Sequence, residues 1–488
     1  MREINKKTLL FVILSGFIFI LLFSVVGSPL YPNSYKGDAT FFSMMGRAII
    51  SGRVPYRDYV DVKGPVFFFW QALGQLLVQG RIGIFILECI SMIFSSIFLY
   101  LLCTLFDFGR KKIFVVFSFV YFIFITTIWG GNTLEEYALP LNLLCLYIGL
   151  LYLKHEWFHP IMPLIYGLVF GCFLFSKITV SAPLVAIVLT IVVYMIKAKA
   201  WDRLRRCVLC FLIGLLFVAV PVLLYFYANH AIHEMLRWTV FMAFGRGVSM
   251  KDTISIDWEY NLFVCYAGAV MGAIELKRKK GKEWWEAALL ISMAVMTGVA
   301  LHFGTPYRYY YTTLIPTLIL ILLYEGRAFD EMVRGENVLR IQGILIEYVM
   351  ILGVVFSSYV MFSVGTITEN ARIIIEKDTR IYNACREIYD YLPENERTHV
   401  YAIDSGMNYY EVNHILPEQR YLDGISNFCV LYPPALEEII RDIDSSDQKW
   451  IISQGMDQVE NVELKQNVMK NYHLEKVFDH LELWKKNS

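Results

Sequence analysis

The sequence predicts an all-α polytopic membrane bundle of about eleven transmembrane helices, followed by a small α/β domain. Of the 488 residues, 57% are hydrophobic and 16% aromatic, and the mean hydropathy is +0.49. This composition is typical of membrane proteins. Apolar runs of roughly 17 to 25 residues recur along the chain, each long enough to cross a bilayer as a helix. The short alternating segments of a membrane β-barrel are not seen, which leaves helices as the spanning structure.

The predicted crossings follow from the positions of these runs. They lie at residues 8–26, 82–106, 113–129, 136–153, 161–176, 180–196, 207–228, 259–275, 286–303, 308–324 and 341–363. The first run follows a basic N-terminus, as a signal peptide would. Because it is too long for one and no Ala-x-Ala cleavage site follows, we interpret it as a retained crossing.

Clusters of Lys and Arg occupy alternate loops between these crossings. The dense clusters are residues 110–112, 197–206, 277–282 and 327–340, all on the side of the N-terminus. Positively charged loops mark the cytoplasmic side of a membrane protein. The N-terminus is therefore predicted to be cytoplasmic, and an odd number of crossings makes the C-terminal domain extracytoplasmic. The formal net charge of zero gives no sign of a nucleic-acid partner.

The composition changes to that of a soluble domain near residue 366. We therefore predict a membrane domain at residues 1–365 and an α/β domain at residues 366–488. The elements expected in the second domain are a helical stretch at Ile373–Tyr391, strands at His399–Ile403 and Trp450–Ser453, and a helix at Ala435–Ile443. About 120 residues are enough for a core of its own.

The most informative stretch is the polar loop after the first crossing. Within it, Phe41–Ser51 and Val66–Leu77 are predicted to be interfacial helices, which lie along the membrane surface. Charged residues surround them, namely Asp38, Arg57, Asp58, Asp61 and Lys63. An unpaired charge next to lipid costs several kcal/mol, so this cluster needs a chemical or structural reason.

These residue types suit a reaction in which a hydroxyl group displaces a lipid phosphate from a sugar carbon. Such a reaction needs a carboxylate that removes the proton from the hydroxyl, and Asp38 is the candidate for this general base. It also needs cations that hold the charge of the departing phosphate. Arg57, Lys63 and Arg308 are the candidates, because cations beside low-dielectric lipid bind phosphate more strongly than they do in bulk water.

Further acids lie on the same side of the membrane as these cations. The supporting acids are Asp58, Asp61, Glu135 and Glu136. They would orient the cations, or, in a second hypothesis, Asp38, Asp61 and Glu136 would hold a divalent metal ion.

Each of these side chains also has an ordinary structural interpretation. Asp38 can cap a helix, and one of the adjacent Glu135 and Glu136 can be an N-terminal helix charge. Arg57 and Arg308 can anchor the chain among lipid head groups. For any single residue the sequence leaves both interpretations open.

The combination of motifs in the first loop resembles that of bacterial GT-C glycosyltransferases, in particular the protein O-mannosyltransferase-like and aminoarabinose-transferase-like enzymes. The resemblance rests on Asp38, Gly46-Arg47, Pro55-Tyr56-Arg57-Asp58, Asp61-x-Lys63-Gly64-Pro65 and the aromatic run to Trp70. It implies a bacterial plasma-membrane enzyme that takes a sugar from a polyprenyl-phosphate donor. The sugar would pass, with inversion, to an acceptor hydroxyl on an outer-surface glycan, lipid or protein.

The resemblance also implies roles for two residues and leaves one question open. It makes Asp38 the base or a metal-associated acid, and Lys63 a contact of the donor phosphate. Many members have a second acid directly after the first, where this chain has Ala39, and one extra residue separates Asp61 from Lys63. Metal-assisted and metal-independent transfer are therefore both retained as hypotheses.

The alternative function is that of a transporter or flippase for a lipid-linked saccharide. Such proteins place charged groups near the bilayer midplane and often consist of two related halves. The sequence instead predicts apolar crossings with charges at one rim, and it has no internal repeat. We therefore expect an enzyme whose partners are membrane lipids, a lipid-linked sugar and an acceptor.

Overall fold

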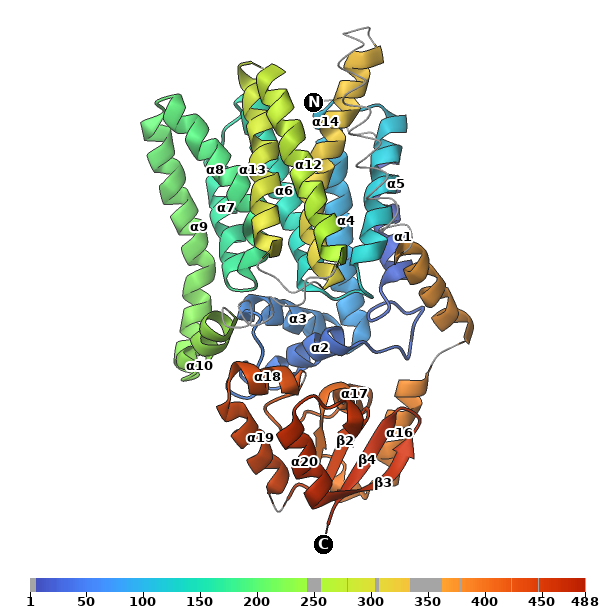
Figure 1. Cartoon of the computed structure of the whole chain (residues 1–488). Coiled ribbons are helices and arrows are strands. Elements are labelled where there is room, and N and C mark those ends of the chain that lie inside the picture. Colours follow the sequence, from blue (N-terminus) through green and yellow to red (C-terminus); the bar gives the residue numbers. More distant parts are fainter. Residues whose placement is uncertain are drawn as a thin grey trace. The chain divides into compact units, whose positions relative to one another are not determined.

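Long helices occupy the positions at which the sequence predicts membrane crossings. In the computed structural model, each predicted crossing from residues 8–26 to residues 308–324 coincides with a helix, which confirms the α-helical membrane bundle (Figure 1). The structure describes residues 6–243, 256–278, 280–302, 307–333, 362–376, 379–422, 424–445 and 447–487. The last predicted crossing, residues 341–363, lies almost wholly outside the described residues.

The chain forms two compact units, each built from three segments of the sequence. The membrane unit comprises Met1–Ser24, Leu87–Val222 and Gly247–Asn370, and the sheet unit comprises Val25–Ile86, Leu223–Arg246 and Ala371–Ser488. The last segment of the sheet unit begins at Ala371, close to the predicted boundary at residue 366. The sheet unit also contains the polar loop after the first helix.

Helices make up the described part of the membrane unit. They are α1 (Lys6–Phe23), α4 (Arg81–Leu105), α5 (Arg110–Thr127), α6 (Leu134–His155), α7 (Ile161–Leu174), η1 (Ile178–Ser181), α8 (Ala182–Lys197), α9 (Trp201–Ala228), α12 (Ile256–Arg278), α13 (Lys282–His302), η3 (Arg308–Leu314), α14 (Ile315–Val333) and a helix over residues 362–376, of which α4, α9 and the last continue into the sheet unit. Seven described helical segments are long and apolar enough to cross a membrane. α5 begins with three basic residues and α7 has only 14 residues, so neither belongs to that group.

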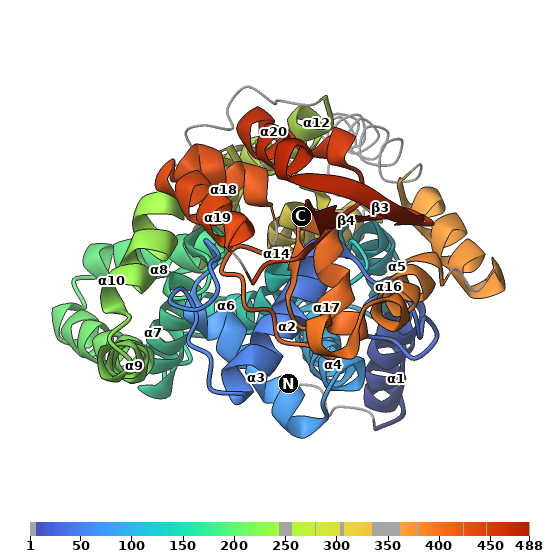
Figure 2. The ribbon, with the colours of Figure 1, turned by 90° about the horizontal axis from the view of Figure 1, so that it is seen from below.

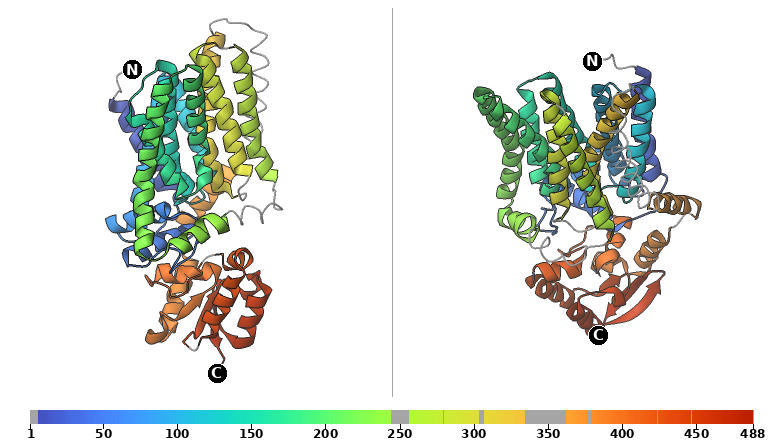
Figure 3. Two further views of the ribbon diagram at one scale, coloured as in Figure 1. Left: turned by 90° about the vertical axis from the view of Figure 1, so that its left-hand side faces the viewer. Right: turned by 45° about the horizontal axis from the view of Figure 1, so that its top comes forward.

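Helix α6 lies at the centre of the membrane unit. Of its most apolar stretch 78% is buried, against 11% for α9, which lies at the edge. Helix α13 packs against α8 and α12, and α8 packs against α6 (Figure 3). Helix α6 begins where it does because the hydroxyl of Thr133 accepts a hydrogen bond from the backbone N–H of Glu136 at 3.4 Å.

The sheet unit combines the helices of the first loop with the C-terminal residues. Its elements are α2 (Gly37–Ile50), α3 (Pro65–Leu77), α10 (Ile232–Leu236), η2 (Arg237–Met242), α16 (Arg380–Tyr391), η4 (Glu394–Glu396), β1 (Val400–Ala402), η5 (Asp404–Met407), α17 (Asn408–Val412), α18 (Ile425–Leu431), α19 (Pro434–Asp444), β2 (Trp450–Ser453), η6 (Met456–Gln458), α20 (Val462–Asn471), β3 (Tyr472–Phe478) and β4 (Leu481–Lys486). The predicted strands and the helix near residue 435 are thus confirmed.

Helices α2 and α3 pack closely against each other. The rings of Phe42 and Phe67 lie 4.9 Å apart between centroids. A Cβ atom at Gly46 would meet the backbone carbonyl carbon of Gln71 at 2.6 Å, so only glycine allows the two helices to approach this closely. Pro65 occupies the first turn of α3, where a missing N–H costs nothing. This packing fixes the ends of the loop between the two helices.

The C-terminal residues form a four-stranded sheet in the order β1-β2-β4-β3. Strands β1 and β2 are parallel, with Tyr401 opposite Ile451, whereas β4 is antiparallel to both β2 and β3. Every residue of β2 is buried, as expected for a strand covered on both faces. Figure 2 shows α20 on one side of the sheet and α16 and α17 on the other.

Candidate active site

The loop between α2 and α3 is folded around Tyr56. This residue has a left-handed backbone conformation, with φ of 68°, and its side chain is completely buried. Its N–H donates to the carbonyl of Tyr59 at 2.7 Å, which closes a tight turn. Its hydroxyl donates to the carbonyl of Lys63 at 2.6 Å. Because burial raises the pKa of this hydroxyl well above its ordinary value, Tyr56 is a neutral donor that fixes the backbone of Lys63.

Lys63 lies between two carboxylates. Its Nζ is 3.5 Å from Oδ2 of Asp61 and 3.8 Å from Oδ2 of Asp38, and it lies 4.5 Å from the centroid of the Phe42 ring. The backbone N–H of Lys63 donates to Oδ1 of Asp61 at 2.7 Å. We call Asp38, Asp61 and Lys63 the Asp38 cluster. The sequence predicted all three as site residues, and the structure brings them together.

The members of the Asp38 cluster differ in exposure. The side chains of Lys63 and Asp61 are 13% and 9% exposed, whereas that of Asp38 is 47% exposed. Asp38 lies in the first turn of α2, where the helix dipole favours its negative form. The cluster therefore presents one reachable carboxylate beside an ammonium group that the protein holds in place.

Arg57 and Asp58 form a pair of their own. The guanidinium of Arg57 donates to Oδ1 and Oδ2 of Asp58 at 2.9 and 3.0 Å, and Oδ2 also accepts from the backbone N–H of Val54 at 2.7 Å. Burial acts to raise the pKa of Asp58, but the hydrogen bonds from Arg57 and Val54 outweigh it and hold that pKa below its ordinary value. Asp58 thus stabilises the turn. The side chain of Arg57 remains 46% exposed and can be reached from solvent.

Residues of the C-terminal segment hold this loop in place. The guanidinium of Arg47, on α2, lies 3.0 Å from Oε2 of Glu411, and the two side chains are 12% and 7% exposed. Arg47 also donates to the carbonyl of Ile415 at 3.1 Å, and Arg420 donates to the carbonyl of Tyr56 at 2.9 Å. Sequence reasoning gave Arg47 no role beyond its motif and did not single out Glu411. No local pattern joins residues so far apart in the chain.

In the membrane unit, Glu135 binds Lys177. The Nζ of Lys177 lies 2.6 Å from Oε1 of Glu135, whose side chain is 2% exposed. The same Nζ lies 3.0 Å from the centroid of the Tyr310 ring. This contact joins the start of α6 to η1 and η3. Lys177 is thus the partner of a buried acid.

Glu88 and Glu136 are buried acids on facing helices. The carboxylate of Glu88, on α4, accepts hydrogen bonds from the hydroxyl of Ser24 and the backbone N–H of Asn132, both at 2.7 Å. Ser91, three residues further along α4, donates to the carbonyl of Glu136 at 3.0 Å. In the described part of the chain, no side chain donates a hydrogen bond to the carboxylate of Glu136, which is 1% exposed and lies near the backbone N–H groups of Asn132 and Thr133. The predicted role of Glu136 as a supporting acid or metal ligand stays a prediction.

The buried carboxylate of Glu88 corrects the sequence analysis, which expected crossings free of charge. Glu88 is completely buried within the run predicted at residues 82–106. Sequence reasoning missed it, although an acid inside an apolar run is itself a signal for a structural or functional site.

Arg308 also belongs to the membrane unit, where it begins η3. Its Cζ lies 3.8 Å from the centroid of the Phe362 ring and 5.6 Å from that of the Trp129 ring. Such contacts with aromatic rings stabilise a guanidinium group near a membrane surface. They agree with the anchoring interpretation of Arg308, and its contact with a donor phosphate stays a prediction.

The predicted metal ligands are divided between the two units. Asp38 and Asp61 both face the ammonium group of Lys63, whereas Glu136 belongs to the membrane unit. Among the residues that the structure describes, no group of three or more His, Cys, Asp or Glu side chains could hold a metal ion. In the Asp38 cluster the positive charge is supplied by Lys63.

Solved structures of a membrane protein share this architecture. ArnT from Cupriavidus metallidurans bound to undecaprenyl phosphate matches with a TM-score of 0.59 over 98% of this chain and 98% of that chain, at 11% identity. Its apo state matches with a TM-score of 0.56 over 98% and 97% of the two chains, at 12% identity. The chain therefore has the fold of the GT-C membrane glycosyltransferases, as the motifs of the first loop predicted.

A family model identifies the chain more narrowly. Residues 2–340 match the family described as "Putative competence-induced protein Ccs4 N-terminal domain". This match covers more than half of the chain, so the chain belongs to that family. A search of the curated proteins finds no match.

Proposed function

We propose that this chain is a membrane glycosyltransferase whose donor is a sugar linked to undecaprenyl phosphate. The GT-C fold supports this class of enzyme, and the similar ArnT structure is bound to undecaprenyl phosphate. The observation that carries the proposal is the geometry of the Asp38 cluster. A half-exposed carboxylate lies 3.8 Å from a partly buried ammonium group, which gives a base and a phosphate-binding cation side by side.

In the proposed reaction, Asp38 is the general base. Its carboxylate takes the proton from the acceptor hydroxyl while the hydroxyl oxygen forms a bond to the anomeric carbon of the sugar. The bond between that carbon and the phosphate oxygen breaks, and the phosphate leaves with the electron pair. Attack from the face opposite the leaving group inverts the anomeric centre. A positioned base contributes about 10²- to 10⁴-fold to such a rate.

Lys63 is the proposed contact of the departing phosphate. Its ammonium group is paired with Asp61, and its backbone carbonyl accepts a hydrogen bond from the hydroxyl of Tyr56. Little reorganisation of Lys63 is therefore needed when charge develops on the phosphate. Arg57 is proposed as a second contact because its guanidinium is 46% exposed while paired with Asp58. Arg308 is retained as a candidate from the sequence.

A metal-assisted reaction is the alternative version of this proposal. A divalent ion would then bind carboxylates that include Asp38 and Asp61 and would offset the phosphate charge that Lys63 offsets in the first version. The two versions differ in their response to a chelator. Loss of transfer after chelation and its recovery with added Mg²⁺ or Mn²⁺ would favour the metal.

The acceptor is proposed to be a hydroxyl group on a glycan, lipid or protein at the outer face of a bacterial plasma membrane. This orientation, with a cytoplasmic N-terminus and an extracytoplasmic C-terminus, is supported by the basic loops at residues 110–112, 197–206 and 277–282. Alkaline phosphatase fused after the C-terminal residue should be active in cells, and a fluorescent protein at the same place should stay dark. The opposite pattern would reverse the orientation.

The test of the function is the fate of lipid-linked sugars in membranes that contain the chain. Wild-type membranes should consume one undecaprenyl-phosphate-linked sugar, measured by mass spectrometry of extracted lipids, with and without chelator. Asp38→Asn should slow this consumption by about 10²- to 10⁴-fold. Asp202→Asn, which changes an exposed acid on α9, is the matched control and should act as wild type.

Two outcomes would contradict the proposal. If Asp38→Asn consumes the donor as fast as wild type, Asp38 is not the base. If wild type moves a lipid-linked saccharide across the bilayer while its total amount stays constant, the chain is a flippase.

A further inference from the structure

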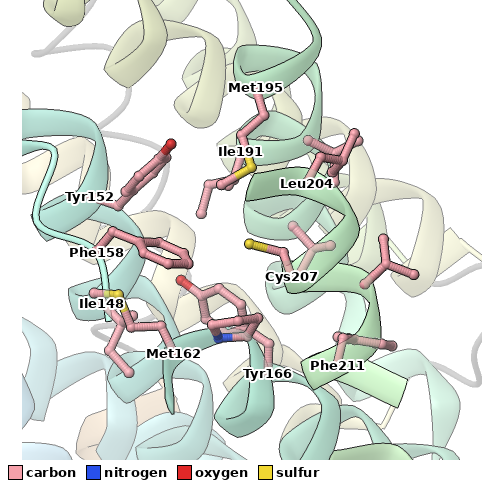
Figure 4. Close-up of a pocket in the computed structure, with 14 residues that line it drawn as sticks. Ile148, Tyr152, Phe158, Met162, Tyr166, Ile191, Met195, Leu204, Cys207 and Phe211 are labelled. Carbon is pink, nitrogen blue, oxygen red and sulfur yellow. The ribbon is translucent and has the colours of Figure 1, made fainter. Parts of the chain in front are cut away.

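An apolar cavity of about 160 Å³ lies in the membrane unit among α6, α7, α8 and α9 (Figure 4). Figure 4 shows the side chains of Phe158 and Cys207 facing each other across it, with Met195 above and Tyr166 below. The cavity is partly open to its surroundings, and cavities with apolar walls accept apolar ligands. None of its lining residues belongs to the Asp38 cluster.

The cavity follows from the way in which α7 and α9 cross. A Cβ atom at Gly167 would meet the carbonyl oxygen of Phe211 at 1.9 Å, and one at Gly214 would meet the carbonyl oxygen of Leu164 at 2.2 Å. Only glycines allow two helix backbones to come this close. The cavity lies between this crossing and the α8–α9 turn, and α9 supplies one of its walls. The cavity therefore results from the way in which α7 and α9 cross, and not from one small side chain.

The turn that joins α8 to α9 is strongly basic. Residues 197–206 contain Lys197, Lys199, Arg203, Arg205 and Arg206 against one acid. That acid, Asp202, is exposed and lies 3.8 Å from Arg205. A turn with this excess of positive charge attracts an anionic group.

Arg203 brings this charge to the rim of the cavity. Its Cζ lies 5.3 Å from the centroid of the Phe158 ring, and Phe158 lines the cavity. The acid nearest in sequence to Phe158 is Glu156, whose Oε1 is 3.2 Å from the Nζ of Lys282 and accepts from the Tyr194 hydroxyl at 3.4 Å. The carboxylate of Glu156 therefore has a cation of its own in Lys282, although it also interacts electrostatically with Arg203. The guanidinium of Arg203 donates a hydrogen bond to the hydroxyl of Tyr152, a residue that lines the cavity, and this contact holds it at the rim.

We propose that this site binds an anionic phospholipid, with part of one acyl chain in the cavity and the phosphate at Arg203. The walls are apolar and suit a hydrocarbon chain, while the rim carries the positive charge that a phosphate requires. Basic pockets between membrane helices bind lipid head groups in this way, and the long side chain of arginine reaches the head-group level. The inference goes beyond the proposed function and does not depend on it.

The experiment uses phosphatidylglycerol with a diazirine in its acyl chain, in vesicles that contain the full-length chain. After irradiation, mass spectrometry measures crosslinks to peptides that cover residues 145–166 and 188–211. Cys207→Phe fills the cavity and should lower these crosslinks by about fivefold or more. Val220→Phe, at a 45% exposed position further along α9, is the matched control and should leave them unchanged.

The role of the charge is tested with a second pair of variants. Arg203→Gln should lower labelling by phosphatidylglycerol about fivefold, as expected for one lost cation near a phosphate. It should not change labelling by diazirine phosphatidylcholine, which carries no net charge. Arg205→Gln removes the same charge two residues further along α9, where the arginine pairs with Asp202. Its effect on labelling by phosphatidylglycerol should therefore be clearly smaller.

Any of three results would overturn the inference. In the first, Cys207→Phe and a second cavity-filling variant, Leu204→Trp, both crosslink to the diazirine lipid as strongly as wild type and keep the wild-type melting temperature. Phosphatidylcholine could label the wild type as strongly as phosphatidylglycerol. Undecaprenyl phosphate could displace the label from these peptides at concentrations at which phosphatidylglycerol does not, which would make the carrier lipid the occupant.

Discussion

The Nζ of Lys63 lies 3.8 Å from Oδ2 of Asp38, and the two side chains differ sharply in exposure. The cation is 13% exposed and is also held by Asp61, whereas the acid is 47% exposed. An ammonium group beside a carboxylate favours the ionised form of the acid, which is the form that a general base needs. Lys63, which is held in place, is thus suited to binding phosphate, and Asp38, which is exposed, is suited to accepting a proton.

Replacing Lys63 tests whether the fixed cation binds the donor phosphate. Lys63→Gln should weaken the binding of undecaprenyl phosphate by about 10- to 100-fold, because a hydrogen bond from a charged donor is lost. The dissociation constant in detergent is the measurement. Lys470→Gln, on the exposed end of α20, is the control and should bind as wild type. Equal affinity for Lys63→Gln and wild type would remove Lys63 from the site.

The pair Arg47 and Glu411 should couple the first loop to the C-terminal residues energetically. Because both side chains are almost buried, Glu411→Gln and Arg47→Met should each cost about 3–5 kcal/mol of stability. Arg47→Met should cost more, since Arg47 also donates to the carbonyl of Ile415. The double variant should lose less than the sum of the two single losses.

Thermal unfolding in detergent measures these losses. Strict additivity would show that the two side chains do not interact. The pair also bears on any truncation of the C-terminal residues: removing them would leave Arg47 without Glu411 and would disturb the loop that carries Asp38.

Asp58 predicts a pH dependence of stability. The pKa of Asp58 is lower in the folded chain than in the unfolded chain. Its contribution to the free energy of unfolding is therefore fully present above the unfolded pKa of about 3.9 and is lost as the pH falls through the folded pKa. Asp58→Asn should therefore lower the melting temperature at neutral pH. The difference from wild type should shrink below about pH 4. A difference that stays constant over this range would mean that the Asp58 charge does not stabilise the turn.

The adjacent acids Glu135 and Glu136 should respond differently to the same substitution. Glu135→Gln removes the charge that pairs with Lys177 and should cost about 3 kcal/mol. Glu136→Gln replaces a buried acid to which no side chain donates among the described residues, so it should be neutral or stabilising. Melting temperatures of the two variants in detergent test this contrast. Equal losses would refute it.

Much of the fold was predictable because the bilayer imposes simple rules on the sequence. The thickness of the hydrocarbon core sets the length of the apolar runs, and the predicted crossings accordingly coincide with helices such as α6 and α13. Alternating short strands and helices likewise predicted β1, β2 and α19 in the C-terminal segment.

Part of the candidate site was predictable because its members lie close together in the chain. Asp61 and Lys63 are two residues apart and share one turn, and Asp38 begins the helix that packs against α3. The roles of Glu88 and Lys177 were not predictable in the same way. Their partners come from other elements, and the sequence does not state which helix faces meet.

The sequence by itself determined the apolar crossings, the position of the polar loop and the residues that bring charge to it. These properties follow from side-chain chemistry and spacing along one chain. Only the tertiary structure decided that Arg47 pairs with Glu411, that the polar loop joins the C-terminal residues in one unit, and that α9 leaves a cavity beside α7. Such contacts join residues far apart in sequence, and they form only where packing brings buried charges and close-fitting backbones together.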